Sequence, residues 1–132
     1  MTQPIPAEFL DLFTKPAFAN LATLMKDGTP QNTPVWVDYD GEYVLVNSAH
    51  GRVKNRNMPL GAPVSITIVD PENPYRYLMV RGRVAVITDW RRPAEVREIF
   101  KIAAEKVVTR QIATQAFYNE RRAAIMERKT LG

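Results

Sequence analysis

Residues 18–46 decide the fold of this chain, and they read FANLATLMKDGTPQNTPVWVDYDGEYVLV. Asp27-Gly28 and Asp40-Gly41 divide the stretch into three runs rich in apolar and β-branched residues. A glycine after an aspartate supplies the positive φ of a tight hairpin turn. The stretch therefore predicts an antiparallel meander of three strands, which cover residues 18–25, 31–39 and 42–46.

Two further strands are predicted after this meander. Residues 63–69 alternate apolar and hydroxyl side chains with a period of two, which indicates a strand. Residues 75–88 form a longer strand pattern interrupted by Gly82, and a glycine inside a strand favours a bulge or a barrel corner. The segment 70–74 between them is predicted to be a loop that crosses another part of the fold.

Helical patterns flank these strands. Short helices are predicted over residues 6–13 and 52–58. Pro93 opens a longer pattern over 94–108, in which apolar residues at 96, 99, 100, 103, 104 and 107 have the spacing of one helix face. With a further helix over 110–119, this pattern predicts a helical insertion over about residues 93–119. Residues 121–127 fit either a helix or a closing strand.

The chain length and the hairpin connections together favour one architecture. A chain of 132 residues is long enough for one domain with a core and too short for two. Five or six strands joined mainly by hairpins leave sheet edges, and closing the sheet on itself removes them. We therefore expect a mainly β fold, a small antiparallel barrel with appended helices, in which residues 1–132 form a single domain.

Composition narrows the function classes. The chain has no cysteine, which excludes disulfides and thiolate catalysis, and its single histidine, His50, excludes a multi-histidine metal site. No apolar run approaches the roughly 20 residues that span a bilayer, and residues 1–6 lack the pattern of a signal peptide. We therefore expect a cytoplasmic protein without a membrane partner. The cations of residues 90–132 are mixed with glutamates, which is more typical of a solvated face than of a nucleic-acid interface.

The segment Gly51-Arg52-Val53-Lys54-Asn55-Arg56-Asn57 is a candidate binding site. It follows the apolar run 43–46 and the small residues 47–49, so that a short helix begins where a strand ends. Backbone N–H groups at a helix start and cationic side chains can converge on one anion, typically a phosphate. Three cations on a surface helix can equally be solvated. The segment alone leaves both interpretations open.

The sequence contains no catalytic constellation. Ser48 and Ser65 have no evident partner that would activate a nucleophile, and His50 stands alone as a general base. No carboxylate pair has the spacing of a metal or glycosidase site. Several aromatic side chains, taken singly, fit core or cross-strand positions: Trp36, Tyr39, Tyr75 and Tyr77. A phosphate site without acid–base side chains indicates a bound cofactor that carries the chemistry itself.

Four motifs in this order and spacing are similar to those of one known family. They are Asn20-Leu21-Ala22-Thr23-Leu24, Asp27-Gly28-Thr29-Pro30-Gln31, Thr33-Pro34-Val35-Trp36 and the cationic segment 51–57. Over roughly residues 9–88, the chain resembles the split β-barrel flavoproteins related to pyridoxamine 5'-phosphate oxidase. Within them it is most similar to the flavin- and deazaflavin-dependent oxidoreductases that use coenzyme F420.

The resemblance implies a homodimer with two cofactor sites at the subunit interface. It assigns the cofactor phosphate to the cationic segment, at Arg52, Lys54, Arg56 and Asn57, with Lys54 the strongest match. It assigns the ring and its linker to two strands, at Gln31, Asn32, Thr33, Pro34 and Val35 and at Asn47, Ser48 and Ala49. The loop with Tyr75, Arg76 and Tyr77 would arrive from the other subunit. Family members usually close with a β-strand, whereas residues 121–129 are a weak strand by propensity.

The function implied by the resemblance is hydride transfer between coenzyme F420 and a small conjugated organic substrate, without a catalytic side chain or a metal. Two alternatives use the same barrel. One is an FMN-dependent oxidoreductase, and the other is a non-enzymatic protein that binds a cofactor or a tetrapyrrole. A longer, more anionic coenzyme tail favours basic residues outside the phosphate site, for which Arg76, Arg81 and Arg83 are candidates, whereas FMN needs only the phosphate site.

Overall fold

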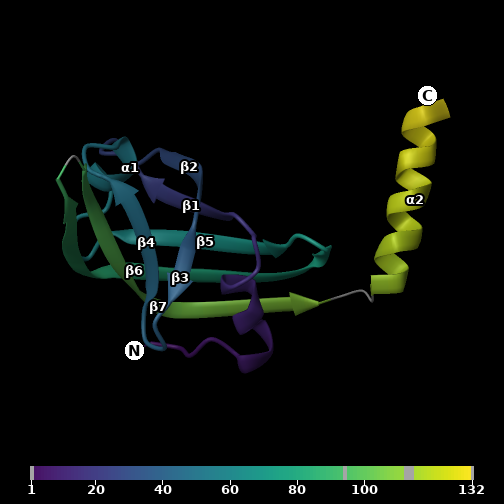
Figure 1. Cartoon of the computed structure of the whole chain (residues 1–132), viewed down its shortest axis with the longest axis horizontal. Helices are drawn as coiled ribbons and strands as arrows, with labels where there is room; N and C mark the ends of the chain where they lie inside the picture. The colour runs from purple at the N-terminus through teal and green to yellow at the C-terminus, as the bar shows by residue number, and fades with distance from the viewer. Residues whose placement is uncertain (1, 94, 112–114, 132) are drawn as a thin grey trace.

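The structure is a computed structural model, and it describes residues 2–93, 95–111 and 115–131. Its main feature is a seven-stranded antiparallel sheet with the strand order β2-β1-β5-β6-β7-β4-β3 (Figure 1). The strands are β1 (Ala19–Leu24), β2 (Pro30–Val35), β3 (Val37–Tyr39), β4 (Val44–Ala49), β5 (Pro63–Asp70), β6 (Asn73–Arg92) and β7 (Glu95–Gln111). A 3-10 helix, η1 (Ala7–Phe13), and two α-helices, α1 (Val53–Arg56) and α2 (Gln115–Leu131), accompany the sheet. The prediction of a mainly β fold is confirmed.

The connection between β2 and β3 closes the sheet into a barrel. These two strands lie at opposite ends of the strand order, yet only Trp36 separates them in the chain. Seven flat strands would place the two ends about 29 Å apart at ~4.8 Å per strand, which one residue cannot span. The sheet must therefore curl until its ends meet. The predicted strand over 31–39 is in fact two strands, and the prediction of a three-stranded meander is wrong because β2 pairs with β1 and β3 with β4.

The two Asp-Gly turns lie where the sequence predicts them. Gly28 and Gly41 have φ values of 86° and 96°, a backbone conformation that would be strained in a residue with a side chain. The first turn joins β1 to β2, and the second joins β3 to β4. Asp27 and Asp40 accept hydrogen bonds from backbone N–H groups inside their own turns, which stabilises both hairpins.

The segment 70–74 does not cross the fold, contrary to its prediction. Asp70 pairs with Asn73 across a tight hairpin turn between β5 and β6. The Asp70 carboxylate accepts a hydrogen bond from the Glu72 backbone N–H at 2.9 Å, which stabilises the turn. Because this short turn joins β5 directly to β6, no loop that crosses the fold is required. The predicted irregularity at Gly82 is confirmed, because the register of β6 against β7 shifts between Arg81 and Gly82.

The predicted helix over 94–108, and with it the helical insertion over 93–119, is wrong for residues 95–111. This segment forms strand β7, which pairs with β6 along its whole length and with β4 over residues 97–102. Phe100, Ile102 and Ala104 are buried with a period of two, and Ile102 is not part of the helical pattern. Pairing on both sides outweighed the local helical preference. The part of the insertion over 112–114 and residue 94 lie outside the described residues.

The core fills the interior of the barrel with alternate side chains from most strands. Leu21, Val46, Ile66, Leu78 and Phe100 are all at most 1% exposed. Leu12 of η1 is equally buried and belongs to the same core. This packing fixes the strands whose ends carry the polar residues described below.

Residues 121–127 are helical and belong to α2, which projects from the barrel at the end opposite to α1 (Figure 1). Its first turns contact the β5–β6 hairpin, where Tyr75 meets Phe117 and Tyr118 at ring-centroid distances of 6.1 and 5.9 Å. Gln115 also donates a hydrogen bond to the Glu72 carbonyl at 2.8 Å. In the described part of the chain, no helix is both long and apolar enough to cross a membrane.

Candidate functional site

The candidate site lies where β4 ends and α1 begins. The chain turns at Gly51, which has a φ of 86°, and enters α1 two residues later. The Asn55 side chain is buried and its Nδ2 donates to the Ala49 carbonyl at 2.8 Å and to Glu98 Oε1 at 3.0 Å. These contacts fix the orientation of α1 on β4 and β7, so that Arg52 and Lys54 are presented by a well-anchored segment.

Arg52 and Lys54 line two adjoining cavities. The first has a volume of about 160 Å³ and is also lined by Pro34, Val35, Trp36, Asn47, Ser48, Ala49 and Arg97. The second has a volume of about 210 Å³ and is also lined by Gln31, Thr33 and Val53. Because Arg52 and Lys54 belong to both linings, we treat the two cavities as one site and call it the cradle.

The electrostatics of the cradle are those of an anion site. Partial burial lowers the pKa of Lys54, and the nearby charges of Arg52 and Arg97 lower it further. Among the described residues, no carboxylate forms an ion pair with Arg52 or Lys54. A bound anion would relieve the repulsion that Arg52 and Lys54 experience, because no described carboxylate pairs with either of these two side chains, whereas Arg97 pairs with Glu95.

Two buried hydroxyl groups point to the same kind of ligand. Thr33 Oγ1 and Ser48 Oγ are buried and have no hydrogen-bond partner among the described residues. Thr33 lines one cavity of the cradle and Ser48 the other. Since a buried polar atom without a partner is costly, each hydroxyl is suited to a polar group of a ligand. The residues present therefore fit a phosphate-bearing cofactor.

Arg97 is a residue of the cradle that the sequence did not indicate. It lies on β7 opposite Ala49, and its Nε donates to Asn47 Oδ1 at 2.6 Å while its Nη1 lies 2.7 Å from Glu95 Oε1. Because residues 94–108 were predicted to form a helix, Arg97 was not expected beside β4. Read as a strand, the alternation of Phe100, Ile102 and Ala104 would have placed Arg97 on the opposite face from these buried residues, but its position beside Ala49 depends on the pairing of β7 with β4.

The structure brings most of the predicted site residues together. Nine of them line the cradle: Gln31, Thr33, Pro34, Val35, Asn47, Ser48, Ala49, Arg52 and Lys54. Asn32 is exposed and lines neither cavity. Asn57 also lines neither cavity, but its Nδ2 donates to Thr23 Oγ1 at 3.1 Å and to Oε1 of the cradle residue Gln31 at 3.4 Å.

The remaining predicted residues lie away from the cradle of their own chain. Arg56 lines a separate, larger cavity beside α1. Tyr75 and Tyr77 lie on β6, and Tyr75 packs against α2. That these two tyrosines reach the site of a second subunit stays a prediction. Two of the basic residues considered for an anionic coenzyme tail are already paired within the chain. Arg76 forms ion pairs with Asp11 and Asp70, and Arg83 pairs with Glu105 at 3.2 Å.

His50 and the acidic residues do not form a reaction centre in the described part of the chain. His50 is exposed, and its backbone N–H donates to the Val96 carbonyl at 3.0 Å. No group of three or more His, Cys, Asp or Glu side chains in these residues is arranged to hold a metal ion. The cradle can bind and orient a charged ligand, and it carries no partnered base or nucleophile.

Comparison with known proteins identifies the family. The sequence profile of the pyridoxamine 5'-phosphate oxidase family matches residues 5–126. The structure is similar to that of an F420 reductase, with 29% sequence identity, a TM-score of 0.67, and 79% of this chain and 98% of that chain covered. No curated protein matches the sequence.

Two structures below 25% identity show the same fold. The FAD binding protein from Mycobacterium smegmatis has 15% identity and a TM-score of 0.59, with 83% of this chain and 100% of that chain covered. The heme storage protein from Vibrio cholerae has 13% identity and a TM-score of 0.60, with 82% and 96% covered. The fold is thus the split β-barrel that the motifs predict, and the chain belongs to the pyridoxamine 5'-phosphate oxidase family, which includes oxidoreductases.

Proposed function

We propose that this protein is an oxidoreductase that binds coenzyme F420 and uses it to reduce or oxidise a small conjugated organic substrate. The observation that carries the proposal is the cradle, in which Arg52, Lys54 and Arg97 lie together without a carboxylate on Arg52 or Lys54. The similarity to an F420 reductase, which is 29% identical in sequence to this chain, supports the choice of a deazaflavin.

The chain's own residues would bind and orient the cofactor rather than react. Arg52 and Lys54 would hold the phosphate, and the hydroxyls of Thr33 and Ser48 would each gain a polar partner. The bound coenzyme would donate the hydride when the substrate is reduced and accept it when the substrate is oxidised. Because the cradle holds no partnered acid or base, the rate would depend on orientation and on the exclusion of water.

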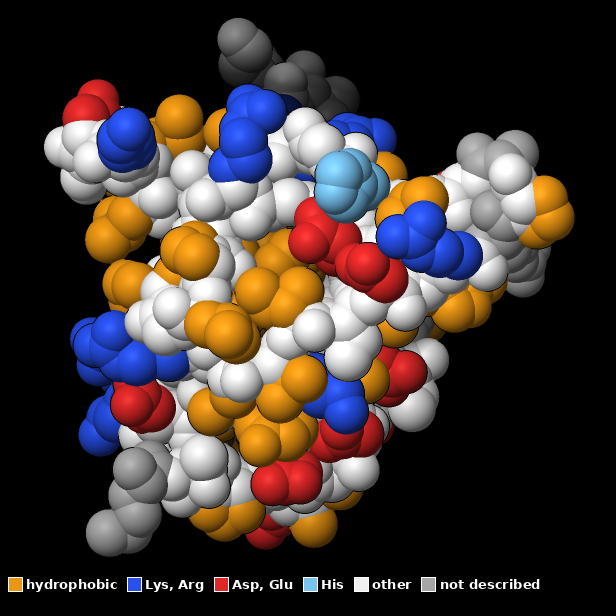
Figure 2. All heavy atoms as spheres, turned by 90° about the vertical axis from the view of Figure 1, so that its left-hand side faces the viewer, with side chains coloured by type: hydrophobic (Ala, Val, Ile, Leu, Met, Phe, Trp, Pro, Cys, Tyr) orange, Lys and Arg blue, Asp and Glu red, His pale blue; other side chains and the backbone are white. Residues whose placement is uncertain are grey.

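We propose further that the protein is a homodimer whose second copy covers the cradle. Phe18 and Trp36 are 57% and 56% exposed, and their rings pack at a centroid distance of 4.1 Å. Figure 2 shows apolar side chains gathered at the centre of one face of the molecule. Since Trp36 also lines the cradle, a subunit that covered this pair would close the site as well. Light scattering that gave only the 15.0 kDa chain at micromolar concentration would contradict this proposal.

FMN is the second candidate, because a single phosphate contact at the cradle would serve either cofactor. The deciding experiment is an equilibrium titration of the purified protein with coenzyme F420 and with FMN, followed by cofactor fluorescence. Tighter binding of coenzyme F420 is the expected result. Much tighter binding of FMN would replace the deazaflavin proposal, and binding of heme alone would favour a non-enzymatic role.

A further inference from the structure

A further cavity lies beside α1, next to the cradle. It has a volume of about 710 Å³ and is lined by the end of β1, the β1–β2 turn, α1 and the segment before β5. Val53 lines both this cavity and the cradle and separates them, because Arg52 and Lys54 line only the cradle and Arg56 only the large cavity. A volume of this size is in the range of about 300–1,000 Å³ that small-molecule sites occupy.

Two cations in this cavity have no ion-pair or hydrogen-bond partner among the described residues. Lys26 and Arg56 line it, and neither side chain forms an ion pair or a hydrogen bond with another described residue. None of the residues that line the cavity is acidic. Cations beside an apolar wall attract anions more strongly than cations in open water do, because the local dielectric constant is lower.

The rest of the lining is apolar. It consists mainly of Leu24, Met25, Val53, Pro59, Leu60, Ala62 and Pro63. Leu24 and Leu60 are 46% and 67% exposed, so that both retain apolar area that a ligand can cover. An apolar wall with two cations in the same lining is complementary to a molecule with one acidic group and an apolar body.

We propose that this cavity, which we call the α1 cavity, binds an apolar organic acid. The acidic group would lie between Lys26 and Arg56, and the hydrocarbon or aromatic body would cover Leu24, Val53 and Leu60. The site goes beyond the proposed function, since it needs no cofactor and uses neither Arg52 nor Lys54, the two cations of the cradle proposed to hold the phosphate. Arg56, which the family resemblance assigns to the phosphate, lines this cavity instead.

The test uses the fluorescence of 1-anilinonaphthalene-8-sulfonate, which combines an aromatic body with an anionic group. Decanoate should displace this probe from the full-length protein in competition titrations, and decanol serves as the uncharged competitor. The variant Lys26→Gln/Arg56→Gln should weaken decanoate by about ten- to a hundredfold, because it removes two charge-assisted contacts, each worth up to about a factor of ten. It should leave decanol almost unchanged.

Two further variants separate charge and apolar contributions. Arg121→Gln/Arg122→Gln removes the same charge from exposed positions on α2 and should leave decanoate binding unchanged. Leu60→Ser should weaken decanoate and decanol alike, and Leu60 is exposed enough for the protein to fold normally. Equal decanoate affinity in the Lys26/Arg56 variant and the wild type would overturn the proposal.

The cofactor titration distinguishes this proposal from the proposed function. Lys54→Ala should weaken the cofactor and leave decanoate binding intact, because Lys54 does not line the α1 cavity. If Lys26→Gln/Arg56→Gln weakened the cofactor and left decanoate unchanged, the cavity would belong to the cofactor site. If the probe bound only after the protein dissociated into monomers, the cavity would be a subunit contact. Either result would overturn the α1 cavity as a separate site.

Discussion

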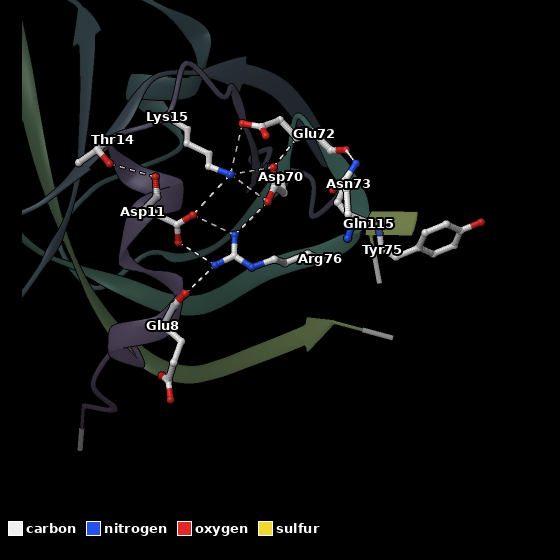
Figure 3. Close-up of polar contacts among 10 residues, drawn as sticks. All are labelled: Glu8, Asp11, Thr14, Lys15, Asp70, Glu72, Asn73, Tyr75, Arg76 and Gln115. Carbon is white, nitrogen blue, oxygen red and sulfur yellow. Dashed lines mark hydrogen bonds and ion pairs between the residues drawn. The ribbon is translucent and has the colours of Figure 1, made fainter. Parts of the chain in front are cut away.

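Arg76 of β6 is joined to Asp11 of η1 by two hydrogen bonds, at 2.7 Å from Nη2 to Oδ1 and 3.1 Å from Nη1 to Oδ2 (Figure 3). The same guanidinium lies 3.0 Å from Asp70, which Lys15 also contacts at 3.2 Å. The side chains of Asp70 and Arg76 are only 5% and 12% exposed. This network therefore joins the N-terminal segment to the β5–β6 hairpin, and none of its side chains lines the cradle.

The first prediction is that Arg76→Ala destabilises the protein. It leaves the buried Asp70 carboxylate with Lys15 as its remaining cationic partner and removes the cation over the Phe9 ring at 4.7 Å. Removing one partner of a buried pair costs about 3–5 kcal/mol, and because Lys15 remains, we expect about 2–3 kcal/mol. Urea unfolding measures the loss. The control Arg81→Ala, at an exposed position on the same strand, should change stability by less than about 0.5 kcal/mol.

The second prediction concerns pH. Burial raises the pKa of Asp70, but the Glu72 N–H, Lys15 and Arg76 outweigh it, and the pKa is lower than usual. The hydrogen bond from Arg76 is the main cause of the lowered pKa of Asp11. A carboxyl with a lowered folded-state pKa stabilises the fold above its unfolded value of about 3.9, and this contribution is lost as the pH falls further.

The free energy of unfolding should therefore fall as the pH drops below about 4. Measurements of urea unfolding at several pH values check this, and Asp70→Asn should make the curve shallower in the same range. An identical slope in Asp70→Asn and the wild type would show that Asp70 does not contribute to acid sensitivity.

The third prediction is that Gly82→Ala strongly destabilises the barrel. A Cβ at this position would lie 2.1 Å from the Ala103 carbonyl oxygen and 3.1 Å from Ile102 Cγ2. The carbonyl belongs to the backbone of β7, so β6 and β7 would have to move apart at the bulge. We expect a loss of about 3 kcal/mol, at the upper end of overpacking costs. Thermal unfolding measures it, with Ala85→Ser at an exposed position of β6 as the control for a small change in size.

The sequence was most informative where local turn chemistry and motifs act together. Gly28, Gly41 and Gly82 marked two hairpins and a bulge, and the segment 51–57 marked one wall of the cradle. β7 was missed because its apolar residues fit two periodicities, and pairing with strands far away in the sequence decides between them. Because β7 was missed, the position of Arg97 in the cradle was missed as well. The break at Trp36 could not be foreseen, because it depends on how the whole sheet closes.

The fourth prediction is that Lys54→Ala weakens cofactor binding and leaves the chemical step at saturating cofactor nearly unchanged. A phosphate keeps its charge throughout hydride transfer, so the contact is equally strong in the ground and transition states. A charge-assisted hydrogen bond is worth about 1.5–3 kcal/mol, or roughly ten- to a hundredfold in the dissociation constant. Fluorescence titration and single-turnover kinetics measure the two effects. Unchanged affinity in a folded variant would eliminate the cradle as the phosphate site.

The last prediction assigns Arg97 to the same site. Arg97→Gln removes one of the charges that lower the pKa of Lys54, so this pKa should rise, although burial and Arg52 still hold it below its usual value. NMR titration of the lysine side chains measures the rise. Cofactor affinity should fall at the same time, because the phosphate loses a nearby cation. Arg97→Lys keeps the charge but not the forked contacts to Asn47 and Glu95, and should restore the low pKa of Lys54. A variant Arg97→Gln with wild-type affinity and an unshifted Lys54 would show that Arg97 only braces β4 against β7.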